Sequence, residues 1–152
     1  MQLADSLPPG TRFLTARGEI TAASLRGSKL VVYFYPKDDT PGCTTEGKDF
    51  TAHQQQFDQA DCRIIGVSKD SLDKHCKFAD KYGFGFDLAS DAEGALCELF
   101  QVWKENSMYG KKYMGIERST FLFDRKGTLA KVWRKVKVSG HVADVLAAAQ
   151  SI

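Results

Sequence analysis

The amino-acid sequence predicts an α/β domain in which helices cover both faces of a mixed central sheet. Two apolar runs, residues 29–36 and 62–68, are rich in β-branched and aromatic residues, which is typical of strands buried on both faces. A helix-like segment follows each run, so these two strands are expected to be parallel. Near the C-terminus two strand-like segments lie close together in the chain, which predicts an antiparallel hairpin in the same sheet.

The N-terminal half supplies the first three elements. Residues 12–25 are predicted to form a short hairpin that turns at residues 16–18. The first buried strand follows. The polar segment 41–59 then carries Phe50 and Phe57 seven residues apart, which fits one amphipathic helix.

The helix after the second buried strand has a clear end and a predicted inner face. Leu72, Cys76 and Ala79 fall on one apolar stripe, and Gly83 is a typical C-terminal capping residue. We therefore expect Cys76 to lie on the face that packs against the protein. His75, its neighbour, is expected at the surface.

Three further elements complete the chain. They are a short helix over 91–100, a hairpin over 118–136 that turns at 124–127, and a closing helix over 140–150. The resulting order is a hairpin, then β-α-β-α, a short helix and β-β-α, within a single domain of residues 1–152. This order predicts a thioredoxin-like fold with an N-terminal hairpin extension.

Composition limits the possible functions. With 152 residues, 43% hydrophobic and 26% charged, the chain is expected to be one soluble domain. A net charge of +2 is too small to indicate nucleic acid or an anionic membrane surface as a partner. The N-terminal residues do not resemble a signal peptide, and no apolar run approaches the roughly 18 residues that span a bilayer. The expected location is the cytoplasm, where thiols are mostly reduced, so the four cysteines are predicted to be metal ligands, redox catalysts or core residues.

The stretch YPKDDTPGCTTE places one thiol, Cys43, where the first buried strand gives way to a helix. A thiol attacks as the thiolate, and an ordinary cysteine is mostly protonated at neutral pH. In the first turn of a helix, free backbone N–H groups and the helix dipole favour the thiolate. Pro41 suits the first helical position. Thr40 is expected to cap the turn or to donate to the sulfur or a bound oxygen, and Gly42 to leave room for a substrate.

This stretch resembles the active-site loop of the peroxiredoxins, in particular the bacterioferritin-comigratory or peroxiredoxin Q group. The blocks MYGKKYMGIERSTFLFD and SDAEGALCELFQVW resemble the same group, and the similarity runs from about Leu3 to the C-terminal helix. The resemblance implies a thiol peroxidase that reduces hydrogen peroxide and organic hydroperoxides. It also implies a thioredoxin or similar dithiol as reductant, a monomer, and no cofactor or metal.

The resemblance assigns roles to five residues. Cys43 corresponds to the peroxidatic cysteine, and Thr40 to the threonine that hydrogen-bonds the peroxide and the sulfur. Pro36 corresponds to the proline that shields the thiolate from solvent. Arg118 corresponds to the arginine that stabilises the thiolate and the peroxide oxygens. Glu46 corresponds to the glutamate that orients this arginine, although an acid in a first helical turn also complements the helix dipole.

The resolving cysteine is less well defined. Many members carry it five residues after the peroxidatic cysteine, where this chain has Lys48. A second subgroup places it in the next helix, where Cys76 lies about one turn before the expected position near Ala79. We assign Cys76 as the resolving cysteine and expect its sulfur to be too far from Cys43 to bond in the reduced state. Cys97 as resolver, or one cysteine with an external thiol, are the alternatives.

Two other classes of function fit the sequence less well. A thioredoxin-type disulfide oxidoreductase requires a C-x-x-C motif, but Thr44, Thr45 and Glu46 follow Cys43. A metal-binding or redox-regulated module would use paired ligands, and the cysteine spacings show no such pairs. Core packing is the better interpretation for Cys62 and Cys97.

Overall fold

The computed structural model describes residues 1–152 apart from the side chain of Met108. The helices are α1 (Ala22–Leu25), α2 (Pro41–Ala52), α3 (Gln54–Gln59), α4 (Leu72–Tyr82), α5 (Ala95–Leu99) and α6 (His141–Ser151). The strands are β1 (Arg12–Thr15), β2 (Gly18–Thr21), β3 (Lys29–Phe34), β4 (Cys62–Ser68), β5 (Asp87–Ser90), β6 (Trp103–Met108), β7 (Lys111–Ile116), β8 (Ser119–Phe123) and β9 (Leu129–Trp133). Among the described residues, no helix is long and apolar enough to cross a membrane.

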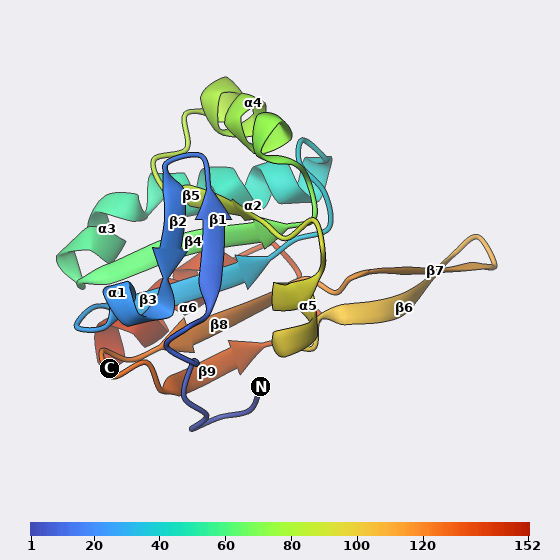
Figure 1. Cartoon of the computed structure of the whole chain (residues 1–152). Coiled ribbons are helices and arrows are strands. Elements are labelled where there is room, and N and C mark those ends of the chain that lie inside the picture. The colour runs from blue at the N-terminus through green and yellow to red at the C-terminus, as the bar shows by residue number, and fades with distance from the viewer.

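Seven strands form one mixed sheet in the order β2-β1-β5-β4-β3-β8-β9 (Figure 1). The central strands β3, β4 and β5 are parallel, whereas β8, β9 and the β1–β2 hairpin join antiparallel. Every residue of β3 is buried, as expected for a strand with neighbours on both sides and helices on both faces. The predicted mixed sheet is confirmed.

Two hydrophobic clusters lie on opposite faces of this sheet, because successive side chains of a strand point to opposite sides. Val32 and Phe34 of β3 belong to the cluster that includes Phe100 and the buried residues of α1 and α5. Val31 and Tyr33 belong to the other cluster, with the buried hydrophobic residues of α2, α3, α4 and α6. Figure 1 shows α5 and α6 on opposite sides of the sheet. Helices therefore cover both faces, as predicted.

The segment predicted as one helix over 41–59 is two helices. His53 adopts φ −102° and ψ 4°, which ends α2 and starts α3. Phe50 of α2 and Phe57 of α3 belong to the same buried cluster. Residues 22–25, included in the predicted hairpin, instead form α1, where the Thr21 side chain accepts the backbone N–H of Ser24.

The predicted inner face of α4 is wrong by one residue. His75 is buried, with 1% of its surface exposed, whereas Cys76 is exposed. Burial of a histidine is tolerated here because both ring nitrogens have hydrogen-bond partners in the interior. Neighbouring residues of a helix point about 100° apart, so the burial of His75 turns Cys76 outward. Gly83 ends the helix at φ 68°, as predicted.

The β6–β7 hairpin extends away from the main sheet and was not predicted (Figure 1). Its second strand ends at Ile116 and β8 starts at Ser119, so Arg118 lies in the short link between them. Ser119 pairs with Phe34, the last residue of β3. Because of this register, Arg118 lies next to the carboxyl end of β3, where the loop that leads to Cys43 begins.

A test of this packing is Gly47→Ala in α2. A Cβ atom at residue 47 would lie 2.8 Å from Cε2 of Phe84 and closer still to Cζ. Alanine normally favours a helix over glycine by about 1 kcal/mol. The clash should reverse this gain and lower the free energy of unfolding by about 1–3 kcal/mol. Urea denaturation measures the change, and the exposed Lys48→Ala is the control. A gain in stability for Gly47→Ala would contradict the contact.

Candidate active site

Cys43 lies in the first turn of α2, at the point where the chain leaves the carboxyl end of β3. Thr40 is the N-cap residue, with extended φ and ψ of −96° and 157°, and Pro41 is the first helical residue. Proline is favoured there because its missing N–H would have no partner in the helix. Cys43 is 2% exposed and belongs to the cluster on the α2 face of the sheet. Its sulfur is therefore shielded from water at the positive end of a helix.

The guanidinium of Arg118 connects Cys43 to Glu46. Nη2 donates to the Cys43 sulfur at 3.4 Å, and Nη1 donates to Oε1 of Glu46 at 2.6 Å. Cys43 and Glu46 are three residues apart on one helix, so their side chains lie on the same face. The three residues that the sequence proposed for the centre of the site are thus brought together.

Glu46 is fully buried, and among the described residues its second oxygen, Oε2, has no hydrogen-bond partner. Burial raises the pKa of Glu46 to about 7 from its ordinary 4.5, although Arg118 lowers it. Desolvation also lowers the pKa of Arg118, but Glu46 and Cys43 raise it by more, so the net shift is upward. Arg118 therefore stays a cation, whereas Glu46 is poised between its two protonation states near neutral pH.

Comparisons with known proteins agree with this geometry. The AhpC/TSA family matches residues 6–132. Peroxiredoxin Bcp of Xanthomonas campestris is 53% identical over 135 residues, covering 89% of this chain and 84% of the relative. Peroxiredoxin Bcp of Bacillus subtilis is 53% identical over 127 residues, covering 84% and 81%.

The chain belongs to the AhpC/TSA family. It is a peroxiredoxin, similar to the Bcp and peroxiredoxin Q proteins, and proteins of this group are thiol peroxidases. A cysteine mutant of PrxQ from Xylella fastidiosa superposes with a TM-score of 0.94 at 39% identity, covering 99% of this chain and 96% of that one. The bacterioferritin comigratory protein of Xanthomonas campestris gives 0.91 at 46% identity, covering 99% and 98%. The thioredoxin-like fold is thereby confirmed.

Thr40 and Gly42 have contacts that differ from those expected. Thr40 is the N-cap residue, but its hydroxyl donates to the carbonyl of Lys37 at 2.8 Å and makes no side-chain capping hydrogen bond. The capping bond, one of its two expected roles, is therefore not formed. A Cβ atom at Gly42 would lie 3.1 Å from Nη2 of Arg118. Glycine therefore leaves room for the guanidinium, which would have to shift by a few tenths of an ångström beside a larger residue. Pro36 is exposed, and its shielding role stays a prediction.

The other three cysteines differ in exposure. Cys62 in β4 and Cys97 in α5 are 2% and 1% exposed and belong to the hydrophobic clusters, as expected for core residues. Burial raises the pKa of Cys62 to about 12, and burial and Asp91 raise that of Cys97. Cys76 is the one exposed cysteine, and all four are free thiols.

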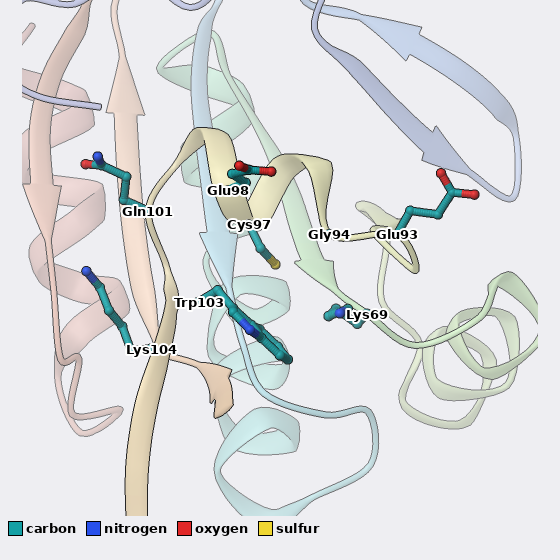
Figure 2. A pocket seen from close by; sticks show the side chains of 8 residues that line it. All are labelled: Lys69, Glu93, Gly94, Cys97, Glu98, Gln101, Trp103 and Lys104. Carbon is teal, nitrogen blue, oxygen red and sulfur yellow. The ribbon is translucent and has the colours of Figure 1, made fainter. Parts of the chain in front are cut away.

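A cavity of about 670 Å³ lies beside Cys97 at the base of the β6–β7 hairpin. Figure 2 shows Trp103 and Lys69 side by side there, and the Lys69 ammonium lies 4.2 Å from the centre of the indole ring. Cys43, Glu46 and Arg118 do not line this cavity. The cavity therefore provides no argument about where a hydroperoxide binds.

The sequence analysis missed a polar network between the Cys43 loop and α4. Asp38 accepts hydrogen bonds from the hydroxyl of Tyr35 and, on its other oxygen, contacts His75. His75 is three residues before Phe78, the other buried residue of α4, and this spacing was the available signal. Within the described side chains, no group of three or more His, Cys, Asp or Glu residues could hold a metal ion.

The Arg118→Ala variant tests the contact with the sulfur. Without the cation, the thiolate of Cys43 is less favoured, and iodoacetamide should alkylate Cys43 about tenfold more slowly at pH 7, which corresponds to about 1.4 kcal/mol. The rate is measured by mass spectrometry in a Cys76→Ser background, so that the exposed thiol does not compete. Arg125→Ala, which removes an exposed arginine, is the control. An unchanged rate would remove Arg118 from the site.

The Glu46→Gln variant tests the raised pKa. Because folded Glu46 keeps its proton up to about pH 7 while the unfolded chain releases it near 4.5, its contribution to stability is present below pH 4.5 and lost as the pH rises towards 7. Glutamine resembles the protonated acid. The variant should match the wild type at pH 4 and exceed it by about 2–3 kcal/mol at pH 7.5 in urea denaturation.

The exposed Glu93→Gln is the matched control for this experiment. It should show the same dependence of stability on pH as the wild type. If the Glu46→Gln curve also runs parallel to that of the wild type, Glu46 is ionised throughout this range and the raised pKa is wrong.

Proposed function

We propose that this peroxiredoxin reduces hydrogen peroxide and organic hydroperoxides through a sulfenic acid on Cys43. The observation that carries the proposal is the 3.4 Å contact between the Cys43 sulfur and Nη2 of Arg118 at the start of α2. The buried sulfur of Cys43 is thus close to both the Arg118 cation and the N-terminus of α2. This arrangement favours a thiolate and also presents donors to a substrate oxygen.

In the first step the Cys43 thiolate attacks the terminal oxygen of the hydroperoxide. A sulfur–oxygen bond forms, the O–O bond breaks, and the electron pair leaves with the alkoxide or hydroxide, which takes a proton to become an alcohol or water. Cys43 is oxidised to the sulfenic acid, and the peroxide is reduced. Arg118 and the free N–H groups of α2 stabilise the departing anion.

Three other residues support this step. Thr40 donates to the peroxide after its hydroxyl leaves the carbonyl of Lys37, since the two acceptors compete for one proton. Pro36 shields the sulfur from solvent. Glu46 holds the guanidinium of Arg118 in place through the 2.6 Å contact.

Cys76 is the proposed resolving cysteine. Its thiol condenses with the Cys43 sulfenic acid to give an intramolecular disulfide and water. Two observations support this choice over Cys97. Cys76 is exposed on α4, whereas Cys97 is buried with a raised pKa. Cys76 also lines a cavity of about 400 Å³ together with Phe84, whose ring reaches Gly47 of α2.

Disulfide formation requires Cα atoms roughly 4.4–6.8 Å apart with aligned Cβ atoms. Cys43 is enclosed in α2 and Cys76 faces outward from α4, so both helices must open locally around these residues. A dithiol reductant of the thioredoxin class then reduces the exposed disulfide. Action as a cytoplasmic monomer, without nucleic acid, membrane or cofactor, remains part of this proposal.

Three serine variants test the assignment during repeated peroxide cycles with thioredoxin. Cys43→Ser should lose all peroxide reduction while keeping its fold, because only the thiolate attacks. Cys76→Ser should form no intramolecular disulfide and should accumulate sulfenic and then sulfinic acid on Cys43. Cys97→Ser should cycle normally. Mass spectrometry of the quenched protein identifies each species.

Other outcomes lead to different conclusions. Turnover by Cys43→Ser would refute the peroxidatic assignment. If Cys97→Ser stalls and Cys76→Ser does not, Cys97 is the resolver. If neither variant stalls, the enzyme works with one cysteine and an external thiol.

A further inference from the structure

A buried hydrogen-bonded pair joins the Cys43 loop to the helix that carries Cys76. Nδ1 of His75 lies 2.6 Å from Oδ2 of Asp38, and both side chains are at least 95% buried. Nε2 of His75 lies 2.9 Å from the carbonyl oxygen of Ala89 in β5. The hydroxyl of Tyr35 donates to the other oxygen of Asp38 at 2.6 Å. Each polar atom of the pair therefore has a partner.

The contacts fix the number of protons in this pair. The carbonyl of Ala89 can only accept, so Nε2 of His75 carries a proton. One further proton must lie between Nδ1 and Oδ2, either on the imidazole beside a carboxylate or on the acid beside a neutral imidazole. In both cases, loss of one partner leaves a buried polar group unpaired.

The pair also lies between the two segments that react. Asp38 is five residues before Cys43, and its N–H donates to Asp70 at the end of β4 at 2.8 Å. His75 directly precedes Cys76. On the exposed side, Asp39 accepts hydrogen bonds from Lys81 and Tyr82 in the last turn of α4. The Cys43 loop is therefore tied to both the first and the last turns of α4.

We propose that Asp38 and His75 form a clamp that keeps α4 closed and thereby limits how fast Cys76 resolves the Cys43 sulfenic acid. This inference rests on the proposed function. Cys76 faces outward, so it can reach Cys43 only if α4 turns or unwinds, and its neighbour His75 then loses both of its interior contacts. Asp38 and His75 are positioning residues, since they touch neither the substrate nor the reacting sulfur.

The clamp affects which of two competing reactions consumes the sulfenic acid. In the first, the Cys76 thiol displaces water from Cys43 and a disulfide forms. In the second, a further hydroperoxide transfers an oxygen to the Cys43 sulfur, which becomes a sulfinic acid while the hydroperoxide becomes an alcohol. A closed α4 lengthens the life of the sulfenic acid and so favours the second reaction at high peroxide.

The test uses two variants. Asp38→Asn keeps the size of Asp38 but replaces the carboxyl group of the pair by a neutral amide, and His75→Gln replaces the imidazole by an amide. Reduced protein is mixed with one equivalent of cumene hydroperoxide, quenched with N-ethylmaleimide and analysed by mass spectrometry. Both variants should form the disulfide at least about fivefold faster than the wild type. With excess hydroperoxide, they should give a correspondingly smaller fraction of sulfinic acid.

Lys77→Gly is the matched control, because it weakens the same helix at an exposed residue without touching the pair. It should accelerate disulfide formation much less. Equal acceleration in Lys77→Gly, or no acceleration in Asp38→Asn and His75→Gln, overturns the clamp. Tyr35→Phe removes one hydrogen bond from Asp38 and should give an intermediate rate if a clamp variant fails to fold.

Backbone hydrogen exchange separates this inference from the role of Cys76. In the reduced protein, Asp38→Asn should increase the exchange rate of amides in α4 relative to the wild type and to Lys48→Ala. Unchanged exchange overturns the clamp whatever Cys76 does. If exchange rises but Cys76→Ser still forms an intramolecular disulfide, Asp38 and His75 do hold α4 closed, whereas the assignment of Cys76 as resolving cysteine fails and the proposed limit on resolution fails with it.

Discussion

The site depends on the guanidinium of Arg118, which links the Cys43 sulfur to a fully buried carboxyl group. Within the described part of the chain, Arg118 is the hydrogen-bond partner of Oε1 of Glu46 and Oε2 has none, so this carboxyl group needs the cation or a proton. The antiparallel pairing of β8 with β3 places Ser119 opposite Phe34, and Arg118 is therefore held at the edge where the Cys43 loop begins. A one-residue slip of this register would turn the strand over and remove the cation from the sulfur.

The surroundings of the sulfur are aromatic as well as charged. Tyr33 stacks on Phe50 at 4.5 Å between ring centres, and Phe84 stacks on Phe86 at 5.4 Å. Burial raises the pKa of Tyr33 well above its ordinary value, so its hydroxyl stays neutral. Cys43 belongs to the same cluster. Because the cluster excludes water, the few oriented donors at the sulfur have a stronger effect than they would in solvent.

The four cysteines differ in burial, in pKa and in the groups that contact their sulfur atoms. Cys62 and Cys97 are enclosed, with raised pKa values, and are poor nucleophiles. Cys43 is enclosed too, but a cation contacts its sulfur. Cys76 is open to solvent on a helix held by its neighbour His75. In the proposed function, reactivity towards peroxide and accessibility to a reductant belong to different thiols, and a change of conformation connects them.

The sequence by itself determined the strand–turn–helix around Cys43, because the apolar run, Pro41 and the following helix are contiguous local signals. The resemblance of its motifs to the peroxiredoxins also implied Arg118 and Glu46 as partners of Cys43, although spacing alone could not place them. Only the tertiary structure decided which face of α4 is buried. His75 is an interior residue because it contacts Asp38 and the carbonyl of Ala89, which are 37 and 14 residues away in the sequence. The pattern of apolar residues along one helix does not indicate such distant hydrogen-bond partners. For the same reason Cys76, predicted to face inward, lies at the surface.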